Sequence, residues 1–203
     1  MRRYRTRRMR VFAEMFAAGA DTRILDVGGT MSNWQLLEGA CPRVTLLNMP
    51  RAGAARDGAA DWVFADGCAL PFADRSFDIV FSNSVIEHVG NAEAQARFAA
   101  EAARVGRRYW IQTPNRHFPI EPHLLTPAIH WLPRALQRRI VPRFTVWQWL
   151  ERPTADRHEF FVRHYLDDIR LLTAAELQRL FPDAAILREK SCGLTKSLIA
   201  ARS

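Results

Sequence analysis

Glycine and aspartate residues in the segment ILDVGGT (24–30) have the types and spacing of a ligand-binding turn. Asp26 lies near the end of a short apolar run, and Gly28-Gly29 follow it. Glycine lets the backbone approach a ligand without a Cβ in the way, and a following helix offers its N-terminal N–H groups. A simple strand-to-helix turn has the same residues, so both interpretations stay open. A dinucleotide fingerprint would need glycine at the third and sixth positions from Gly28, where the chain has threonine and asparagine, so a nicotinamide cofactor is disfavoured.

Histidine is the side chain whose ordinary pKa best suits proton transfer near neutral pH. His117 and His123 lie in the segment TPNRHFPIEPH (113–123), whose prolines restrict the backbone, and His88 lies in an earlier loop. The same histidines could instead be surface or loop-stabilising residues. The chain contains neither H-x₃-H nor H-E-x-x-H, so we predict no metal site.

Short apolar segments, which must position these residues, alternate with helical ones. Strands are predicted over 23–27, 43–47, 62–65, 77–82 and 107–113, and an amphipathic helix over 91–106. Strands that alternate with helices form a parallel sheet covered on both faces. In such sheets ligands bind at the carboxyl ends of the strands, where Asp26, Asp66 and Asn83 stand.

The C-terminal part predicts one more helix and two more strands. A capping box at Thr173–Glu176 opens a helix that ends before Pro182. Strands are predicted over 184–189 and 195–201, joined as a hairpin around Cys192-Gly193. We therefore predict an α/β fold with a Rossmann-like, doubly wound, seven-stranded sheet, which is mostly parallel with an antiparallel last strand and has helices on both faces.

The motifs after the strands, taken in order, resemble the class I S-adenosylmethionine-dependent methyltransferases, in the branch called methyltransferase type 11. That family has an acidic-Gly loop after its first strand, an Asp after its third, a run D-A-x-x-L-P-F-x-D-x-S-F-D, and a V-x-E-H helix. The equivalents here are DVG (26–28), DGCALPFADRSFD (66–78) and VIEH (85–88). The resemblance covers roughly residues 20–115 and implies S-adenosylmethionine as the cofactor.

The resemblance also implies roles for the first loop. Gly28 and Gly29 would lie against the methionine portion of the cofactor, with Asp26 near its amino group. The family's loop usually carries two further glycines. This chain has Thr30 and Ser32 in their place.

At the end of the second strand the family usually has an acid that binds both ribose hydroxyls, and here Asn48 holds that place. Asn48 can donate and accept hydrogen bonds, but it lacks the charge that strengthens them. The resemblance implies that Met49 packs on the adenine. It further implies that Asp66 accepts from the adenine amino group, with Gly67 and Cys68 beside the ring.

Asn83 and Ser84 would sit at the methyl end of the cofactor, again by resemblance. A hydroxyl acceptor there would gain from a general base with a pKa near the working pH. Our first choice for this catalytic base is His123, then His117, because both follow the fifth strand. His88 is a third candidate, although an E-H pair is often structural.

We expect a small-molecule methyltransferase that acts on a hydroxyl oxygen, possible acceptors being a saccharide or a lipid-linked glycan. Methyltransferases of base amino groups usually have N/D-P-P-Y/F after the fourth strand, whereas residues 82–85 read SNSV. Nucleic acid is therefore a less favoured substrate. The alternatives are an RNA-directed methyltransferase and a non-catalytic S-adenosylmethionine-binding partner protein.

Most of the formal net charge of +8 belongs to the N-terminus, since the first ten residues contain six arginines and no acid. Residues 4–19 are predicted to be helical, with an apolar stripe opposite an arginine stripe. The helix could pack on the domain, contact an anionic membrane surface or contact nucleic acid. The apolar stripe comprises Met9, Phe12 and Phe16, and the basic stripe comprises Arg3, Arg7 and Arg10.

Residues 115–165 show no clean period, and this length exceeds that of a plain connection. Five of the six histidines lie there, and three tryptophans stand among arginines, so we expect a lid or a substrate-binding insertion. We predict one methyltransferase domain over 1–203. Its parts are an Arg-rich N-terminal helix (1–19), a cofactor-binding core (20–115), an insertion (116–165), and a final helix with a β-hairpin (166–203).

We expect a cytoplasmic protein, and the pattern DVGGT…W, which ends at Trp34, resembles a bacterial subgroup. No apolar run is long enough to span a membrane, and the N-terminus lacks the apolar region of a secretory signal. Cys41, Cys68 and Cys192 are an odd number without metal-ligand spacing, which fits a reducing compartment. The oligomeric state stays open.

Overall fold

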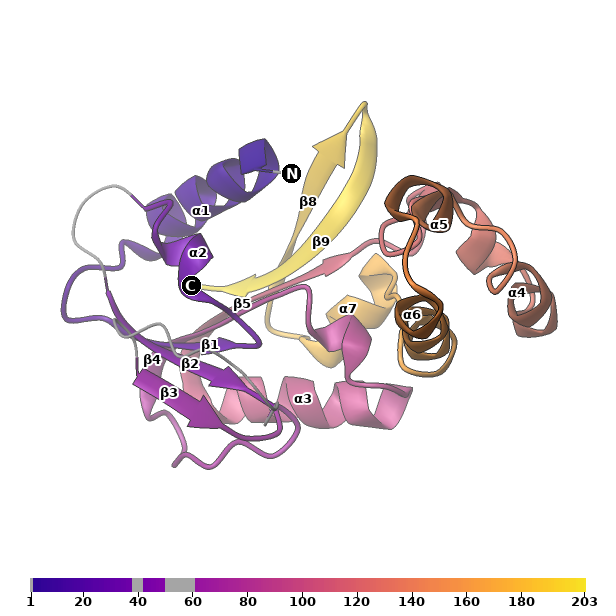
Figure 1. Cartoon of the computed structure of the whole chain (residues 1–203). Helices are drawn as coiled ribbons and strands as arrows, with labels where there is room; N and C mark the ends of the chain where they lie inside the picture. The colour runs from indigo at the N-terminus through magenta and orange to yellow at the C-terminus, as the bar shows by residue number, and fades with distance from the viewer. Residues whose placement is uncertain (1, 38–41, 50–60) are drawn as a thin grey trace.

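The computed structural model describes residues 2–37, 42–49 and 61–203, which contain one seven-stranded sheet with helices against both faces (Figure 1). The strands lie in the order β3-β2-β1-β4-β5-β9-β8. They are β1 (Arg23–Val27), β2 (Arg43–Asn48), β3 (Asp61–Phe64), β4 (Phe77–Asn83), β5 (Gly106–Pro114), β8 (Ala185–Ser191) and β9 (Leu194–Arg202).

Helices connect these strands and also form the segment between β5 and β8. The α-helices are α1 (Arg2–Phe16), α2 (Met31–Trp34), α3 (Ala92–Val105), α4 (Arg134–Ile140), α5 (Val146–Glu151), α6 (Ala155–Asp167) and α7 (Ala174–Leu180). The shorter elements are the 3₁₀ helices η1 (Ile86–His88) and η2 (Ile129–Trp131) and the two-stranded ribbon β6 (Ile120–Glu121) and β7 (Thr126–Pro127). None of the described helices has the length and hydropathy needed to cross a bilayer.

The sheet confirms the predicted topology. Strands β1 to β5 pair in parallel, while β9 runs antiparallel to both β5 and β8. The hairpin between β8 and β9 has a two-residue loop, Cys192-Gly193, and both residues have positive φ. Positive φ at both central residues is the geometry of a type I′ turn, which matches the twist of antiparallel strands.

The N-terminal helix α1 packs on one face of the sheet, opposite α3 and α7 (Figure 1). Its predicted apolar stripe is buried, and the Phe12 ring contacts the rings of Trp34, Phe81 and Trp110 at centroid distances of 5.2–5.8 Å. The structure therefore confirms the interpretation of a packing helix. The helix ends at Phe16 rather than at residue 19, and Ala17 follows with positive φ.

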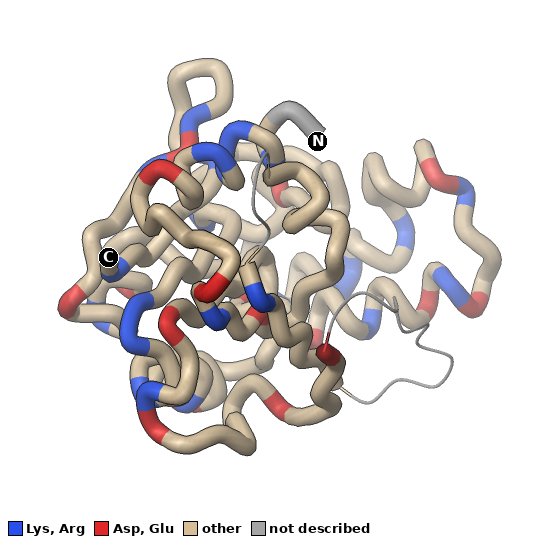
Figure 2. Tube along the Cα trace, turned by 90° about the vertical axis from the view of Figure 1, so that its left-hand side faces the viewer, with Lys and Arg blue, Asp and Glu red and all other residues tan. Residues whose placement is uncertain are grey.

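Arg8 of this helix is buried, although it stands in a run of charged residues that the sequence did not mark as buried. The Arg8 guanidinium forms an ion pair with Glu189 of β8 at 2.6 Å, with both side chains less than a tenth exposed. It also donates to Gln112 of β5 at 2.8 Å and to Asn83 of β4. Removing one partner of a buried pair costs about 3–5 kcal/mol, so Arg8 is a structural part of the domain. Outside α1, the basic positions are spread along the chain among acidic ones (Figure 2).

The predicted insertion is a group of short helices with its own core. Leu124, Val141, Val162 and Tyr165 belong to a hydrophobic cluster separate from the two that cover the sheet. Helices α4 to α6 stand beyond one end of the sheet (Figure 1). Helix α6 continues to Asp167, two residues past the predicted boundary. Helices of 6 to 13 residues are too short to give the sequence a clear period.

Candidate functional site

A cavity of about 330 Å³ opens at the carboxyl ends of β1, β2 and β3. Its volume lies at the lower end of the range for ligand pockets, about 300–1,000 Å³. Six of the ten predicted cofactor-binding residues line it: Gly28, Asn48, Met49, Asp66, Gly67 and Cys68. Other residues also line this cavity: His88, which was predicted as a candidate base, and Val85, Arg97 and Phe98, to which the sequence analysis gave no role. These come from η1 and α3, and no family motif quoted above marks Arg97 or Phe98.

Gly28 shapes the wall of this first cavity. It has φ +75°, its N–H donates to the Leu47 carbonyl at 2.7 Å, and an added Cβ would lie 2.4 Å from Val85 Cγ2. Only glycine meets both the positive φ and the close approach. The predicted backbone turn is therefore present at this position.

The polar residues of the first cavity are tied to the neighbouring loops. The Asn48 amide donates to the Gly29 carbonyl at 3.0 Å, which an acid at this position could not do when ionised. The Asp66 carboxylate accepts from the Cys68 N–H at 2.8 Å. Asparagine in place of the usual acid therefore holds the β1–α2 loop against β2.

Asp26 is placed away from the first cavity, as is Gly29, among the residues that the structure describes. The Asp26 side chain is fully buried and accepts from Trp34 Nε1 at 2.8 Å, while its Oδ1 has no hydrogen-bond partner. Burial raises the pKa of Asp26 from 3.8 to about 7, against the lowering effect of the Trp34 bond. Its predicted place near the cofactor amino group remains a prediction, and its observed contact is with Trp34.

A second cavity of about 330 Å³ lies at the carboxyl ends of β4 and β5. Asn83 and Ser84, the other two predicted cofactor-binding residues, line it. Ser84 has φ +59°, a conformation that costs energy in a residue with a Cβ, and its side chain donates to Gln112 at 2.9 Å. The remaining wall combines polar side chains with the rings of Tyr4 and Phe118, and its polar members include Arg8, Gln112, Asn115 and Lys196.

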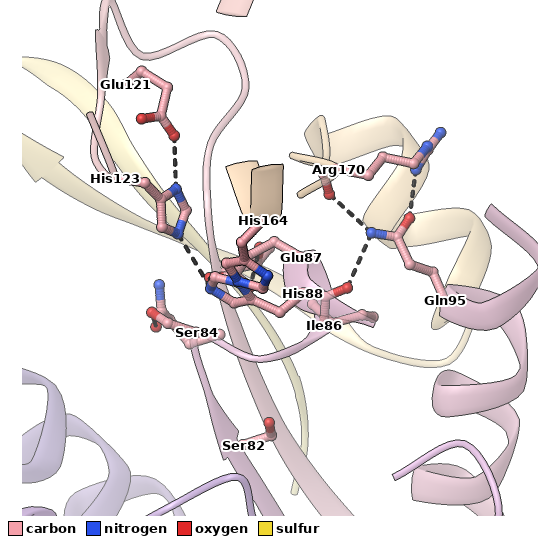
Figure 3. A network of polar contacts seen from close by, with 12 residues as sticks. Ser82, Ser84, Ile86, Glu87, His88, Gln95, Glu121, His123, His164 and Arg170 are labelled. Carbon is pink, nitrogen blue, oxygen red and sulfur yellow. Dashed lines mark hydrogen bonds and ion pairs between the residues drawn. The ribbon is translucent and has the colours of Figure 1, made fainter. Parts of the chain in front are cut away.

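Three histidines meet in one cluster (Figure 3), and one of them, His88, lines the first cavity. His88 Nε2 lies 3.2 Å from His123 Nε2, and His88 Nδ1 lies 3.2 Å from His164 Nε2. His123 Nδ1 bonds the buried Glu121 carboxylate at 2.7 Å, and His164 Nδ1 bonds Asp168 at 2.7 Å. The structure thus brings together His88 and His123, which were predicted, and His164, which was not.

His117, the other predicted catalytic residue, is exposed and lies outside the histidine cluster. Its backbone N–H donates to the Asn115 side chain at 3.2 Å. His164 escaped prediction because it lies 76 residues from His88 in the sequence, on helix α6. Only the packing of α6 near η1 joins them.

The backbone that carries His88 is fixed by two residues from other elements (Figure 3). Gln95 of α3 donates to the Ile86 carbonyl at 3.0 Å and to the Arg170 carbonyl at 2.9 Å. The Arg170 N–H donates to the Glu87 carbonyl at 2.8 Å. These bonds satisfy buried backbone groups and hold the backbone of η1 in place.

The titration behaviour of the cluster follows from burial and mutual contact. Burial and the neighbouring rings of His123 and His164 lower the pKa of His88 from 6.5 to about 4. Burial raises the pKa of Glu87 from 4.5 to about 7. Burial lowers the pKa of His123, but its bond to Glu121 outweighs this effect and raises the pKa above the ordinary value. His88 is therefore a neutral ring at pH 7.

Comparison with known families finds one match, a methyltransferase domain, over residues 25–108. This stretch contains the first cavity's Gly28, Asn48 and Asp66 and the β4 strand end. Residues 25–108 therefore carry a methyltransferase domain, and a SAM-dependent methyltransferase of known structure shares the fold of the chain. The recognised resemblance is thereby confirmed, together with the cofactor that it implies.

Solved structures share the fold of this methyltransferase at low sequence identity. A SAM-dependent methyltransferase from Methanosarcina mazei is 13% identical, with a TM-score of 0.52 and 94% of each chain covered. The PH0226 protein from Pyrococcus horikoshii is 13% identical with a TM-score of 0.57, covering 96% of this chain and 88% of that one. A candidate zinc-dependent alcohol dehydrogenase from Rhodobacter sphaeroides is 13% identical with a TM-score of 0.62, covering 96% and 87%. At such identity these likenesses show the fold alone. No curated protein sequence matches the methyltransferase.

The first cavity fits the cofactor of the family. Its glycine turn admits a ligand close to the backbone, and Val85 and Phe98 give apolar walls for a ring. Asn48 and Asp66 supply polar groups on the same wall. A ligand pocket of this kind combines apolar surface with a few oriented polar groups.

We predict that Asp66→Ala weakens S-adenosylmethionine binding about 10- to 100-fold, since a hydrogen bond to a charged acceptor contributes about 1.5–3 kcal/mol. Isothermal titration calorimetry measures the change. Asp61→Ala is the matched control, because Asp61 is an exposed aspartate at the start of β3. Equal affinity in the two variants would contradict the assignment of Asp66.

We predict that Asp26 makes the protein less stable as the pH rises from 4 to 7. The unfolded chain loses the Asp26 proton near pH 3.8, whereas the folded protein keeps it up to about pH 7. Asp26→Asn removes this difference, so its melting temperature should rise relative to the wild type as the pH increases. Each kcal/mol corresponds to about 2–4 °C in a chain of this size. Thermal unfolding at pH 4, 5, 6, 7 and 8 tests this, with Asp61→Asn as the control. A difference that is the same at every pH would refute it.

Proposed function

We propose that this methyltransferase transfers the methyl group to a hydroxyl oxygen of a small, polar acceptor bound in the second cavity. The observation that carries the proposal is the place of His123. Its Nε2 lies 3.2 Å from His88, which lines the cofactor cavity, and its neighbour Pro122 lines the second cavity. A group that assists removal of a hydroxyl proton is needed at such a boundary.

The lining of the second cavity supports a hydroxylated acceptor. Asn83, Gln112 and Asn115 offer amide groups, and Tyr4 and Phe118 offer ring surface. Lys196 lies over the Tyr4 ring at 4.2 Å and, with Arg5, brings positive charge to the wall. These groups suit a saccharide that carries a phosphate or carboxylate, since charge-assisted bonds to such anions are strong.

The chain's own residues position the reaction. S-adenosylmethionine supplies a methyl group already activated by its sulfonium. Gly28, Asn48 and Asp66 would hold the cofactor, and the strand ends of β4 and β5 would place the acceptor hydroxyl beside the histidine cluster. Alignment of two reactants in this way can contribute about 7–11 kcal/mol.

We predict that His123→Gln lowers the rate of methyl transfer about 100-fold or more and leaves S-adenosylmethionine affinity unchanged. Transfer is measured with labelled cofactor against monosaccharides, sugar phosphates and phenols. His158→Gln is the control, because His158 lies on α6 beside Trp147, away from the cluster. Full activity of His123→Gln with any accepted substrate would count against this role.

The same assay separates the alternatives. Transfer to RNA, with none to the hydroxylated small molecules, would favour an RNA-directed methyltransferase. Cofactor binding without transfer to any class would favour a non-catalytic binding protein.

We further propose that α1 contacts an anionic membrane surface, as access to a lipid-linked glycan would require. Arg5, Arg7 and Arg10 are exposed, whereas the apolar stripe of α1 is buried, so this contact would be electrostatic. A cytoplasmic location remains a prediction from the sequence.

Replacing Arg5, Arg7 and Arg10 together with glutamine should weaken binding to anionic vesicles roughly 100-fold, at about 1 kcal/mol for each arginine. Flotation with phosphatidylglycerol vesicles measures this, with phosphatidylcholine vesicles as the control. Deleting residues 1–10 is unsuitable, because it removes the buried Arg8 and Met9. Wild-type protein that stays unbound on anionic vesicles would exclude the membrane contact.

A further inference from the structure

His88 Nε2 and His123 Nε2 face each other in the histidine cluster. When all three rings of the cluster are neutral, neither of these two nitrogens carries a proton. A neutral imidazole carries one N–H. His164 needs its proton on Nδ1 to donate to Asp168, so its Nε2 accepts from His88 Nδ1. His123 needs its proton on Nδ1 to donate to Glu121. When all three rings are neutral, the three protons are then used, and the unprotonated Nε2 atoms of His88 and His123 lie 3.2 Å apart.

A buried carboxylate oxygen lies beside these lone pairs (Figure 3). Glu87 is fully buried, and its Oε2 accepts from Thr113 Oγ1 at 3.0 Å. Its Oε1 has no hydrogen-bond partner and lies 4.0 Å from His88 Nε2. Glu87 Oε1 and the Nε2 atoms of His88 and His123 therefore lie close together, and each of these three atoms can bind a cation.

We propose that Glu87, His88 and His123 bind one divalent transition-metal ion. The three donor atoms lie within 4.8 Å of one another. Two imidazole ligands at about 2.0–2.1 Å from a tetrahedral zinc ion stand about 3.3 Å apart, close to the 3.2 Å separation here. A small rotation of the Glu87 carboxylate brings Oε1 into the same shell. Two histidines and one carboxylate form the ligand set of several zinc and iron sites and leave positions open for a substrate.

The outer contacts of both rings are those that metal-binding histidines need. Such a histidine usually gives its other N–H to a carboxylate or another acceptor, which fixes the ring and its tautomer. His123 has Glu121, itself held by the Leu124 N–H at 2.6 Å. His88 has His164, which is held in turn by Asp168.

This inference departs from the sequence-based expectation of no metal site. The ligands come from η1 and from the loop between β6 and β7, so they show none of the local spacings of helical metal sites. That the ion serves the acceptor rests on the proposed function, whereas its binding does not. A divalent ion lowers the pKa of a hydroxyl that it binds, so the hydroxyl proton passes to solvent more readily. With the ion bound, His123 Nε2 would be a ligand, and His123 would assist the reaction through the ion and not as the base itself.

Equilibrium dialysis of the metal-stripped full chain against Zn²⁺, with metal content measured by mass spectrometry, tests the site without any acceptor. We expect one Zn²⁺ per chain, and about 100-fold weaker binding for Glu87→Gln and for His123→Gln. Glu121→Gln should weaken binding about 10- to 100-fold, because it acts through His123. Mg²⁺, which prefers oxygen ligands, should not compete.

His117→Gln is the matched control, since it removes an exposed histidine six residues from His123. Circular dichroism confirms that each variant folds. Co²⁺ in place of Zn²⁺ should give a visible spectrum without a thiolate band, because Cys68 lines the neighbouring cavity but is not a ligand. Less than one ion bound per chain, equal binding by wild type and Glu87→Gln, or a thiolate band would overturn the metal site. Separate titration with S-adenosylmethionine shows whether the cofactor site itself has failed.

Discussion

Arg8 joins three segments that lie far apart in the sequence, and the carboxyl ends of β4 and β5 depend on the contacts it makes. From α1 it pairs with Glu189 of β8 and donates to Gln112 of β5 and Asn83 of β4. A guanidinium presents donors in a fixed fork, so one side chain can satisfy several acceptors at once. This contact places α1 across the ends of β4 and β5 and makes the N-terminal helix part of the wall of the second cavity.

Buried carboxylates arrange the rest of this edge. A carboxylate removed from water needs hydrogen bonds, and here Asp26 and Glu87 find a partner in another element, while Glu121 finds its partners in the loop that follows it. Asp26 holds Trp34 of α2, Glu87 accepts from Thr113 of β5, and Glu121 bonds His123 and the Leu124 N–H. The oxygens left without partners, Asp26 Oδ1 and Glu87 Oε1, differ in their surroundings. Glu87 Oε1 lies close to the rings of His88 and His123, so these three groups could bind a ligand together.

The insertion contributes to the site through one helix and one loop. Its core is separate from the cores of the sheet, and it places His164 and His123 beside η1. The tryptophans that stand among the arginines of the insertion are partly buried in its core and partly exposed. Trp147 stacks on Phe161 at 4.1 Å inside the insertion, while Trp131 and Trp149 are exposed. A substrate-binding or lid role for this part remains a prediction.

The sequence by itself determined the sheet and indicated six of the residues that line the first cavity. Apolar strands, the Gly28 turn and the capping box at Thr173 are local patterns, and the carboxyl ends of neighbouring parallel strands must meet at one edge. Tertiary structure alone decided the burial of Arg8, the turn of Asp26 toward Trp34 and the meeting of His88, His123 and His164. These contacts join residues whose sequence separation carries no periodic signal. They arise because polar groups that are enclosed by packing must satisfy one another, and packing is settled only when the whole chain has folded.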